Sequence, residues 1–177
     1  EIGLSGEIVL GGSSVGDAEL LNMQAGGGHD PVRNGFNVPN VELFVGGTVD
    51  PYFDAQATVV FAIDQAGETV VELEEAFATT RDLPHGLQAK AGQYFTEFGR
   101  HNTQHVHSWS FVDQPVVLSR LFGGDGLRSQ GARAAWLTPL PWYSEVMFGA
   151  QNARGETVPS FLGEAGEDVG GFTLLDR

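Results

Sequence analysis

Strict alternation of apolar and polar side chains is the feature that most constrains this chain. Between residues 53 and 64, one set of alternate positions is apolar and the other set is mostly polar. The apolar set is Phe53, Ala55, Ala57, Val59, Phe61 and Ile63, and the polar set includes Asp54, Gln56, Thr58 and Asp64. Successive side chains of a β-strand point to opposite faces, so this spacing predicts a two-faced strand.

The same reasoning predicts strands along most of the chain. The further strand-like segments are residues 2–10, 41–50, 69–81, 87–98, 132–139 and 142–152, which Gly, Pro and Asp clusters separate. The total is about seven strands, and no repeat or low-complexity linker divides them. We therefore expect a single domain over residues 1–177.

The connections between these strands alternate in length. Tight, proline-rich turns are expected at residues 50–53, 83–86 and 139–142. The intervening connections are residues 13–37, 65–68, 99–130 and 153 onward, and three of these four are long. Short connections at one end and long ones at the other are typical of an outer-membrane barrel.

Strand length and aromatic positions favour the same interpretation. A tilted membrane-spanning strand needs about 9–11 residues, whereas strands of soluble proteins most often have about 5–6. Barrels also carry an aromatic girdle at each membrane surface. The candidate girdle residues are Tyr52, Phe53, Trp142 and Tyr143 at the short turns, and Phe61, Phe95 and Phe98 toward the other end.

Composition excludes several classes of function. The net charge is −14 and Lys90 is the sole lysine, which argues against binding nucleic acid, because phosphate neutralisation needs clustered basic residues. The sequence contains no run of 18 apolar residues, so no transmembrane helix is predicted. The chain lacks cysteine, and it contains no H-E-x-x-H or phosphate-binding loop motif, so we do not expect an enzyme.

Four segments resemble a family of Gram-negative outer-membrane proteins, the porin-like barrels described as hypothetical or zinc-regulated outer-membrane receptors. The segments are residues 71–80, 90–100, 104–115 (QHVHSWSFVDQP) and 137–145 (LTPLPWYSE). The arrangement of residues 98–100, 111–113 and Arg120 is also similar to phosphate-selective porins. The resemblance implies an all-β fold, an antiparallel up-and-down transmembrane β-barrel, located in the cell outer membrane.

Seven strands do not close an ordinary bacterial barrel, which has an even number of at least eight. We therefore expect the chain to be the N-terminal portion of a larger barrel, or residues 170–177 to begin an eighth strand. The expected partners are outer-membrane lipid and small solutes, and the barrel could form a homo-oligomer or a membrane complex.

Charged residues on the polar strand faces are the candidates for lining a pore. Residues 115–124 lie in a long loop that could fold inward, which would place Arg120 and Arg128 in the lumen; the alternative is an extracellular cap. The candidate pore-lining residues are Glu72, Glu74, Lys90, Arg120, Arg133 and Glu145. With acidic groups in excess, cations or neutral solutes should pass more readily than phosphate.

Two polar residues do not fit the alternation. Glu75 falls in phase with Val71 and Leu73, and Gln93 falls in phase with Leu87, so both are expected on the apolar face. A β-bulge near Glu74 and Glu75 would turn these carboxylates to the other face.

A histidine-rich stretch could bind a metal ion. His101, His105 and His107 have the spacing H-x3-H-x-H, and Asp113 follows them. Neutral imidazoles that converge with a carboxylate could bind Zn²⁺; no other cofactor is expected. The alternative is that these side chains form hydrogen bonds within a packed loop.

Three functions remain open at this point. The first is a porin-like barrel that lets small solutes diffuse across the outer membrane. The second is an outer-membrane structural or surface-binding barrel whose long loops contact a partner or a metal. The third is a soluble β-sandwich that acts as a binding module.

Overall fold

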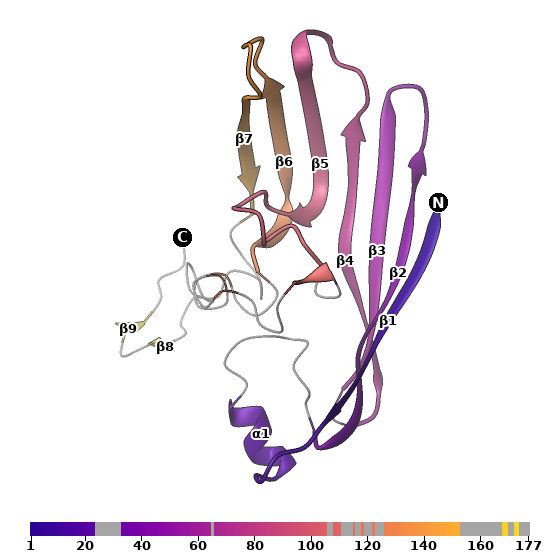
Figure 1. Ribbon diagram of the computed structural model, residues 1–177, viewed down its shortest axis with the longest axis vertical. Helices are drawn as coiled ribbons and strands as arrows, with labels where there is room; N and C mark the ends of the chain where they lie inside the picture. The colour runs from indigo at the N-terminus through magenta and orange to yellow at the C-terminus, as the bar shows by residue number, and fades with distance from the viewer. Residues whose placement is uncertain are drawn as a thin grey trace.

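Seven antiparallel strands form a single sheet, and each pairs with its neighbours in chain order (Figure 1). The computed structural model describes residues 1–23, 33–64, 66–105, 108–110, 115, 118, 122, 126–152, 168–169 and 172–173. The strands are β1 (Ile2–Gly11), β2 (Gly35–Thr48), β3 (Phe53–Ile63), β4 (Thr69–Thr80), β5 (Leu87–Phe95), β6 (Arg128–Leu137) and β7 (Glu145–Gln151). The predicted all-β class and the seven strands are confirmed.

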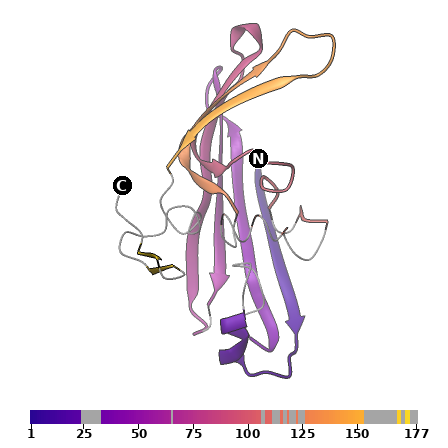
Figure 2. The same cartoon turned by 90° about the vertical axis from the view of Figure 1, so that its left-hand side faces the viewer.

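The sheet is an open, twisted layer with β1 and β7 at its edges (Figure 2). The three short connections lie together at one end, the upper end in Figure 1. Strands β8 (Asp168–Val169) and β9 (Phe172–Thr173) pair with each other in a separate two-stranded sheet. Phe172 and Thr173 are the described part of residues 170–177, and they do not extend the seven-stranded sheet as the expected eighth strand would.

Two helical segments and two strand starts were not predicted. Helix α1 (Asp17–Met23) follows β1, and the short 3₁₀ helix η1 (Pro84–Gly86) lies between β4 and β5. Strand β2 begins at Gly35 and β6 begins at Arg128, both earlier than the alternation indicated. No helix in the described part of the chain is both long and apolar enough to cross a membrane.

The two faces of the sheet differ in chemistry, and the apolar face is the exposed one. We call it the outer face; the cross-strand partners Leu43, Val59 and Leu73 lie on it. Other outer-face residues are Ile2, Leu4, Val45, Phe53, Phe61, Ile63, Val71, Leu87, Trp136, Val146 and Phe148. On edge strand β1, Ile2, Leu4, Ile8 and Leu10 are 67% to 77% exposed.

The opposite face, the inner face, carries most of the polar side chains of the strands. Residues of this face include Ser5, Asn40, Glu42, Gln56, Thr58, Glu72, Glu75, Lys90, Ser129 and Arg133. Asn40, Glu42, Thr58, Glu75, Ser129 and Arg133 are buried there, beside the apolar residues Val60 and Tyr94. The predicted alternation within residues 53–63 is therefore confirmed, with its polar side covered and its apolar side open.

A β-bulge at Glu74 resolves both exceptions to the alternation. Thr58 pairs with Glu75 and Val59 pairs with Leu73, so Glu74 is the extra residue of β4. Both glutamates are buried on the inner side, as a bulge allows. Gln93 stays on the outer face, where its amide donates to the carbonyl oxygens of Leu73 and Glu74 and so satisfies the backbone that the bulge releases.

The aromatic residues expected to form a girdle at the short turns are exposed, whereas one of those expected at the other end is buried. Tyr52, Trp142 and Tyr143 are between 64% and 80% exposed. The prediction for Phe95 was wrong, because its ring is buried and packs edge-to-face against His105, with centroids 5.7 Å apart.

Candidate functional site

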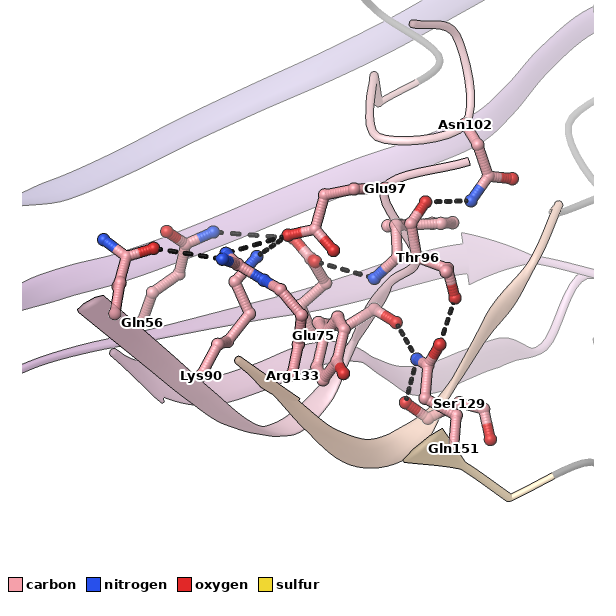
Figure 3. Close-up of polar contacts among 12 residues, drawn as sticks. Gln56, Glu75, Lys90, Thr96, Glu97, Asn102, Ser129, Arg133 and Gln151 are labelled. Atoms are coloured by element: carbon pink, nitrogen blue, oxygen red, sulfur yellow. Dashed lines mark hydrogen bonds and ion pairs between the residues drawn. The ribbon is translucent and has the colours of Figure 1, made fainter. Parts of the chain in front are cut away.

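The connection between β5 and β6 brings the candidate site residues onto the inner face. Asn102 joins the two ends of this connection. The Asn102 amide donates to the carbonyl oxygens of Thr96 (2.8 Å) and Leu127 (2.9 Å), and Leu127 N donates to Asn102 Oδ1 (2.8 Å). Asn102 is buried, so these bonds are shielded from water. Figure 3 shows Asn102 beside Thr96 at this junction.

His105, from this connection, lies among three glutamates of the sheet. Its Nδ1 is 2.9 Å from Glu74 Oε2 and 3.4 Å from Glu42 Oε2. Its other ring nitrogen, Nε2, is 3.1 Å from Glu75 Oε2. All three glutamates are at least nine-tenths buried, whereas the His105 side chain is 19% exposed.

This environment strongly favours a positive charge on His105. Burial alone would lower the pKa of the imidazole, but hydrogen bonds to Glu42, Glu74 and Glu75 outweigh that effect and raise its pKa to about 12. Three carboxylates and one imidazolium still leave the group with net negative charge, because an imidazolium carries a single positive charge.

Surrounding residues hold the glutamates in place. Asn40 Nδ2 donates to Glu42 Oε1 (2.7 Å), and the backbone nitrogen of Phe95 donates to Glu75 Oε1 (3.1 Å). Each of these carboxylates therefore has one oxygen held by a donor and the other oxygen turned toward His105. The three acidic side chains come from β2 and β4, and the strand pairing of β3 with both fixes the distance between them.

A second charged cluster joins β5, β6 and the same connection. Lys90 Nζ lies 2.7 Å and an Arg133 guanidinium nitrogen lies 3.0 Å from the same oxygen, Glu97 Oε1 (Figure 3). Arg133 also donates to Gln88 Oε1 (3.2 Å). Burial alone would raise the pKa of Glu97, but the hydrogen bond from Lys90 and the charges of Lys90 and Arg133 together lower it.

The candidate pore-lining residues separate into several groups. Glu74, Lys90 and Arg133 belong to the two clusters above, and Glu72 pairs with Arg128. Glu145 is apart from both clusters and accepts a hydrogen bond from Tyr143 (2.7 Å). Arg120 lies outside the described residues, so its predicted place in a lumen stays a prediction.

His105 is the residue of the predicted metal set that the described part of the chain places among the three glutamates. His101 packs its ring against Trp109, with centroids 4.8 Å apart, and His107 and Asp113 lie outside the described residues. The group of metal-ligand side chains found among the described residues is Glu42, Glu74 and His105. The alternation of residues 41–50 could have indicated Glu42 as a residue of the polar face. No such pattern indicated Glu97 as a site residue, because it follows the end of β5.

Comparison with known proteins gives one relative without an assigned function. The chain is 44% identical over 139 residues to an uncharacterized protein of Aquifex aeolicus (strain VF5). The match covers 76% of this chain but 28% of that protein, so the chain spans little more than a quarter of its relative. No family model matches the chain, and no solved structure matches it.

Proposed function

We propose that this chain forms part of the wall of an outer-membrane β-barrel through which small solutes diffuse. The observation that carries the proposal is the distribution of side chains across the sheet. The outer face is apolar and exposed along its strands, while the inner face buries glutamate, arginine, asparagine and threonine. A soluble sheet has the reverse arrangement, with its apolar face packed on a core.

Exposure of the outer face to water would be unfavourable. Burying apolar surface is worth about 25 cal/mol per Å², and exposed apolar patches beyond a few hundred Å² mark contact with protein or membrane. The apolar residues of the outer face run from β1 through to Phe148 of β7. Bilayer hydrocarbon would cover this whole face without any second protein layer.

Other features support the barrel. The up-and-down order of the strands, the short connections at one end and the exposed aromatic residues beside them are the layout of such proteins. The relative from Aquifex aeolicus is long enough to supply further strands that would close the sheet. We infer that these seven strands belong to a larger barrel.

The inner face suggests which solutes would pass. Its strand carboxylates, among them Glu42, Glu72, Glu74 and Glu75, outnumber Lys90, Arg128 and Arg133. A water-filled lumen of this kind would raise the local concentration of cations. We therefore propose that cations and neutral solutes pass more readily than phosphate.

Planar-bilayer recordings test this function. The full-length protein, purified in detergent, should insert and give stepwise conductance, and a salt gradient should give a reversal potential of the sign for cation preference. Conductance with anion preference would contradict the selectivity, and no conductance from protein that has inserted would contradict diffusion.

The second candidate function is an outer-membrane anchor without a channel. It is favoured by the position of the β5–β6 connection, which lies across the inner face and makes ion pairs to four strands there. A barrel filled in this way would display loops to a partner and conduct little. Inserted protein that is silent in the recordings would support this candidate.

A further inference from the structure

We propose that Glu42, Glu74 and His105 bind a divalent transition-metal ion of the Zn²⁺ type, which fastens the β5–β6 connection to the inner face. The sequence suggested three histidines with Asp113, whereas this site consists of two glutamates and one histidine. It does not depend on whether the barrel conducts solutes.

The positions of the three candidate ligand atoms fit such an ion. His105 Nδ1 is 3.4 Å from Glu42 Oε2 and 2.9 Å from Glu74 Oε2, and the ligand atoms of the group all lie within 4.8 Å of one another. Two ligands that are each about 2.1 Å from a tetrahedral zinc ion lie about 3.4 Å apart. Small side-chain movements would therefore suffice to coordinate it.

Hydrogen bonding alone does not account for both carboxylates at Nδ1. A ring nitrogen carries at most one proton, yet two carboxylate oxygens lie within 3.4 Å of it. Glu74 is 3% exposed, and its Oε2 lies 2.9 Å from His105 Nδ1 without the direction of a good hydrogen bond. Among the described residues, no lysine or arginine pairs with Glu74 or Glu75. A metal ion would take the place of the single proton that Nδ1 can carry, and it would contact both carboxylate oxygens at once.

A second, independent observation is the hydroxyl of Thr58. This side chain is 1% exposed, and its Oγ1 has no hydrogen-bond partner among the described residues. Thr58 lines the same pocket as Glu42 and His105, a space of about 360 Å³. A buried hydroxyl of a residue that lines this pocket can accept a hydrogen bond from a hydrated ion.

The outer shell is also that of a metal site. Histidine ligands usually donate their other ring N–H to a carboxylate, and His105 Nε2 lies 3.1 Å from Glu75 Oε2. Glu42 Oε1 accepts from Asn40 (2.7 Å), and Glu42 Oε2 lies 3.4 Å from His105 Nδ1. Mixed oxygen and imidazole ligands suit Zn²⁺ and its first-row neighbours more than Ca²⁺ or Mg²⁺, which take oxygen ligands.

Calorimetric titration of Zn²⁺ into the full-length protein in detergent, after treatment with a chelator, tests the site. We expect one ion per chain. Glu75→Gln should weaken binding by about 10- to 100-fold through the outer shell, and His105→Ala and Glu74→Gln should weaken it further. The matched control His101→Ala, in the same connection, should leave the affinity unchanged.

Circular dichroism of each variant shows whether its strands are intact. X-ray absorption of the zinc-loaded wild-type protein needs no variant, and should show one imidazole together with carboxylate oxygens. The proposal would be overturned by wild-type protein that binds no Zn²⁺, by equal affinity in a folded Glu74→Gln variant, or by an absorption spectrum with two or more imidazoles.

Discussion

Glu75 stands directly opposite Thr58 in the β3–β4 ladder, although Leu73, two residues earlier, stands opposite the next residue of β3, Val59. This single shift of register leaves Glu74 unpaired and lets two consecutive glutamates face the same side of the sheet. Without it, one of them would face the apolar side. In the proposed barrel that side meets lipid, where a basic residue at mid-depth costs roughly 2–4 kcal/mol and an acidic one less.

Gln93 should stabilise the bulge. Gln93→Ala removes the donors to the Leu73 and Glu74 carbonyl oxygens, so we expect the free energy of unfolding to fall by about 1–3 kcal/mol. Denaturant titration in lipid vesicles, followed by tryptophan fluorescence, measures this change. Deletion of Glu74 should make the ladder regular, so Gln93→Ala should have a much smaller effect in that variant. Equal losses of stability in the wild-type chain and in the chain without Glu74 would contradict the role assigned to Gln93.

Gly92 should not tolerate a side chain. Its φ is 137°, and a Cβ at this position would lie 2.2 Å from the carbonyl oxygen of Ala76 on the neighbouring strand. Gly92→Ala should therefore destabilise the fold by about 3 kcal/mol or more by separating β4 from β5. The neighbouring substitution Ala91→Gly serves as the control and should cost at most about 1 kcal/mol. Similar unfolding free energies for the two variants would show that the close approach is absent.

Glu97 should make stability depend on pH. Its folded-state pKa is lowered from the ordinary value of 4.5, so its contribution is complete above that value and disappears as the pH falls through the lowered pKa. At neutral pH, Glu97→Gln should reduce the unfolding free energy by about 1.5–3 kcal/mol, and this difference should vanish in acid. Glu68→Gln, at an exposed position, is the control and should change the unfolding free energy little at either pH. A deficit in Glu97→Gln that is the same at both pH values would refute the assignment.

Asn102 should hold the β5–β6 connection on the inner face. Asn102→Ala removes three hydrogen bonds at its base, two of them to backbone carbonyl oxygens of Thr96 and Leu127. We expect faster protease cleavage within residues 99–105 and, if the barrel conducts, a larger single-channel conductance. Unchanged cleavage and conductance would mean that other contacts hold this connection.

The strands could be predicted from the sequence because alternation is a local property of each segment. Val59 and Phe61 reveal the outer face without any knowledge of their neighbours. The sequence did not predict the early start of β2, because Pro39 and two asparagines interrupt the apolar pattern there. Asn37 is nevertheless buried, and its amide donates to the carbonyl oxygens of Arg33 (2.8 Å) and Gly35 (3.1 Å).

The candidate site depends on contacts between residues that are far apart in the chain. His105 meets Glu42 across 63 positions of the chain, in a connection whose two ends Asn102 joins by hydrogen bonds to Thr96 and Leu127. Sequence spacing pointed instead to neighbouring histidines, and the structure places His101 against Trp109. A bulge was inferred from the misfit of Glu75, but its position at Glu74 follows from the pairing of β3 with β4.

Charge placed on either face should distinguish a membrane sheet from a soluble one. Val59→Arg, on the outer face, should destabilise the inserted protein by about 2–4 kcal/mol. Gln56→Arg, on the inner face of the same strand and 3.5 Å from Glu75, should have little effect. Vesicle-based unfolding measures both. Near-neutral behaviour of Val59→Arg would indicate that its side chain faces water.

The most direct measurement is the accessibility of single spin labels along β3, in full-length protein reconstituted into lipid vesicles. Labels at positions 57, 59 and 61 should collide more with oxygen, which concentrates in hydrocarbon, and labels at positions 56 and 58 should be shielded from oxygen. A polar nickel reagent reaching positions 57, 59 and 61 freely would contradict the claim that this face meets lipid.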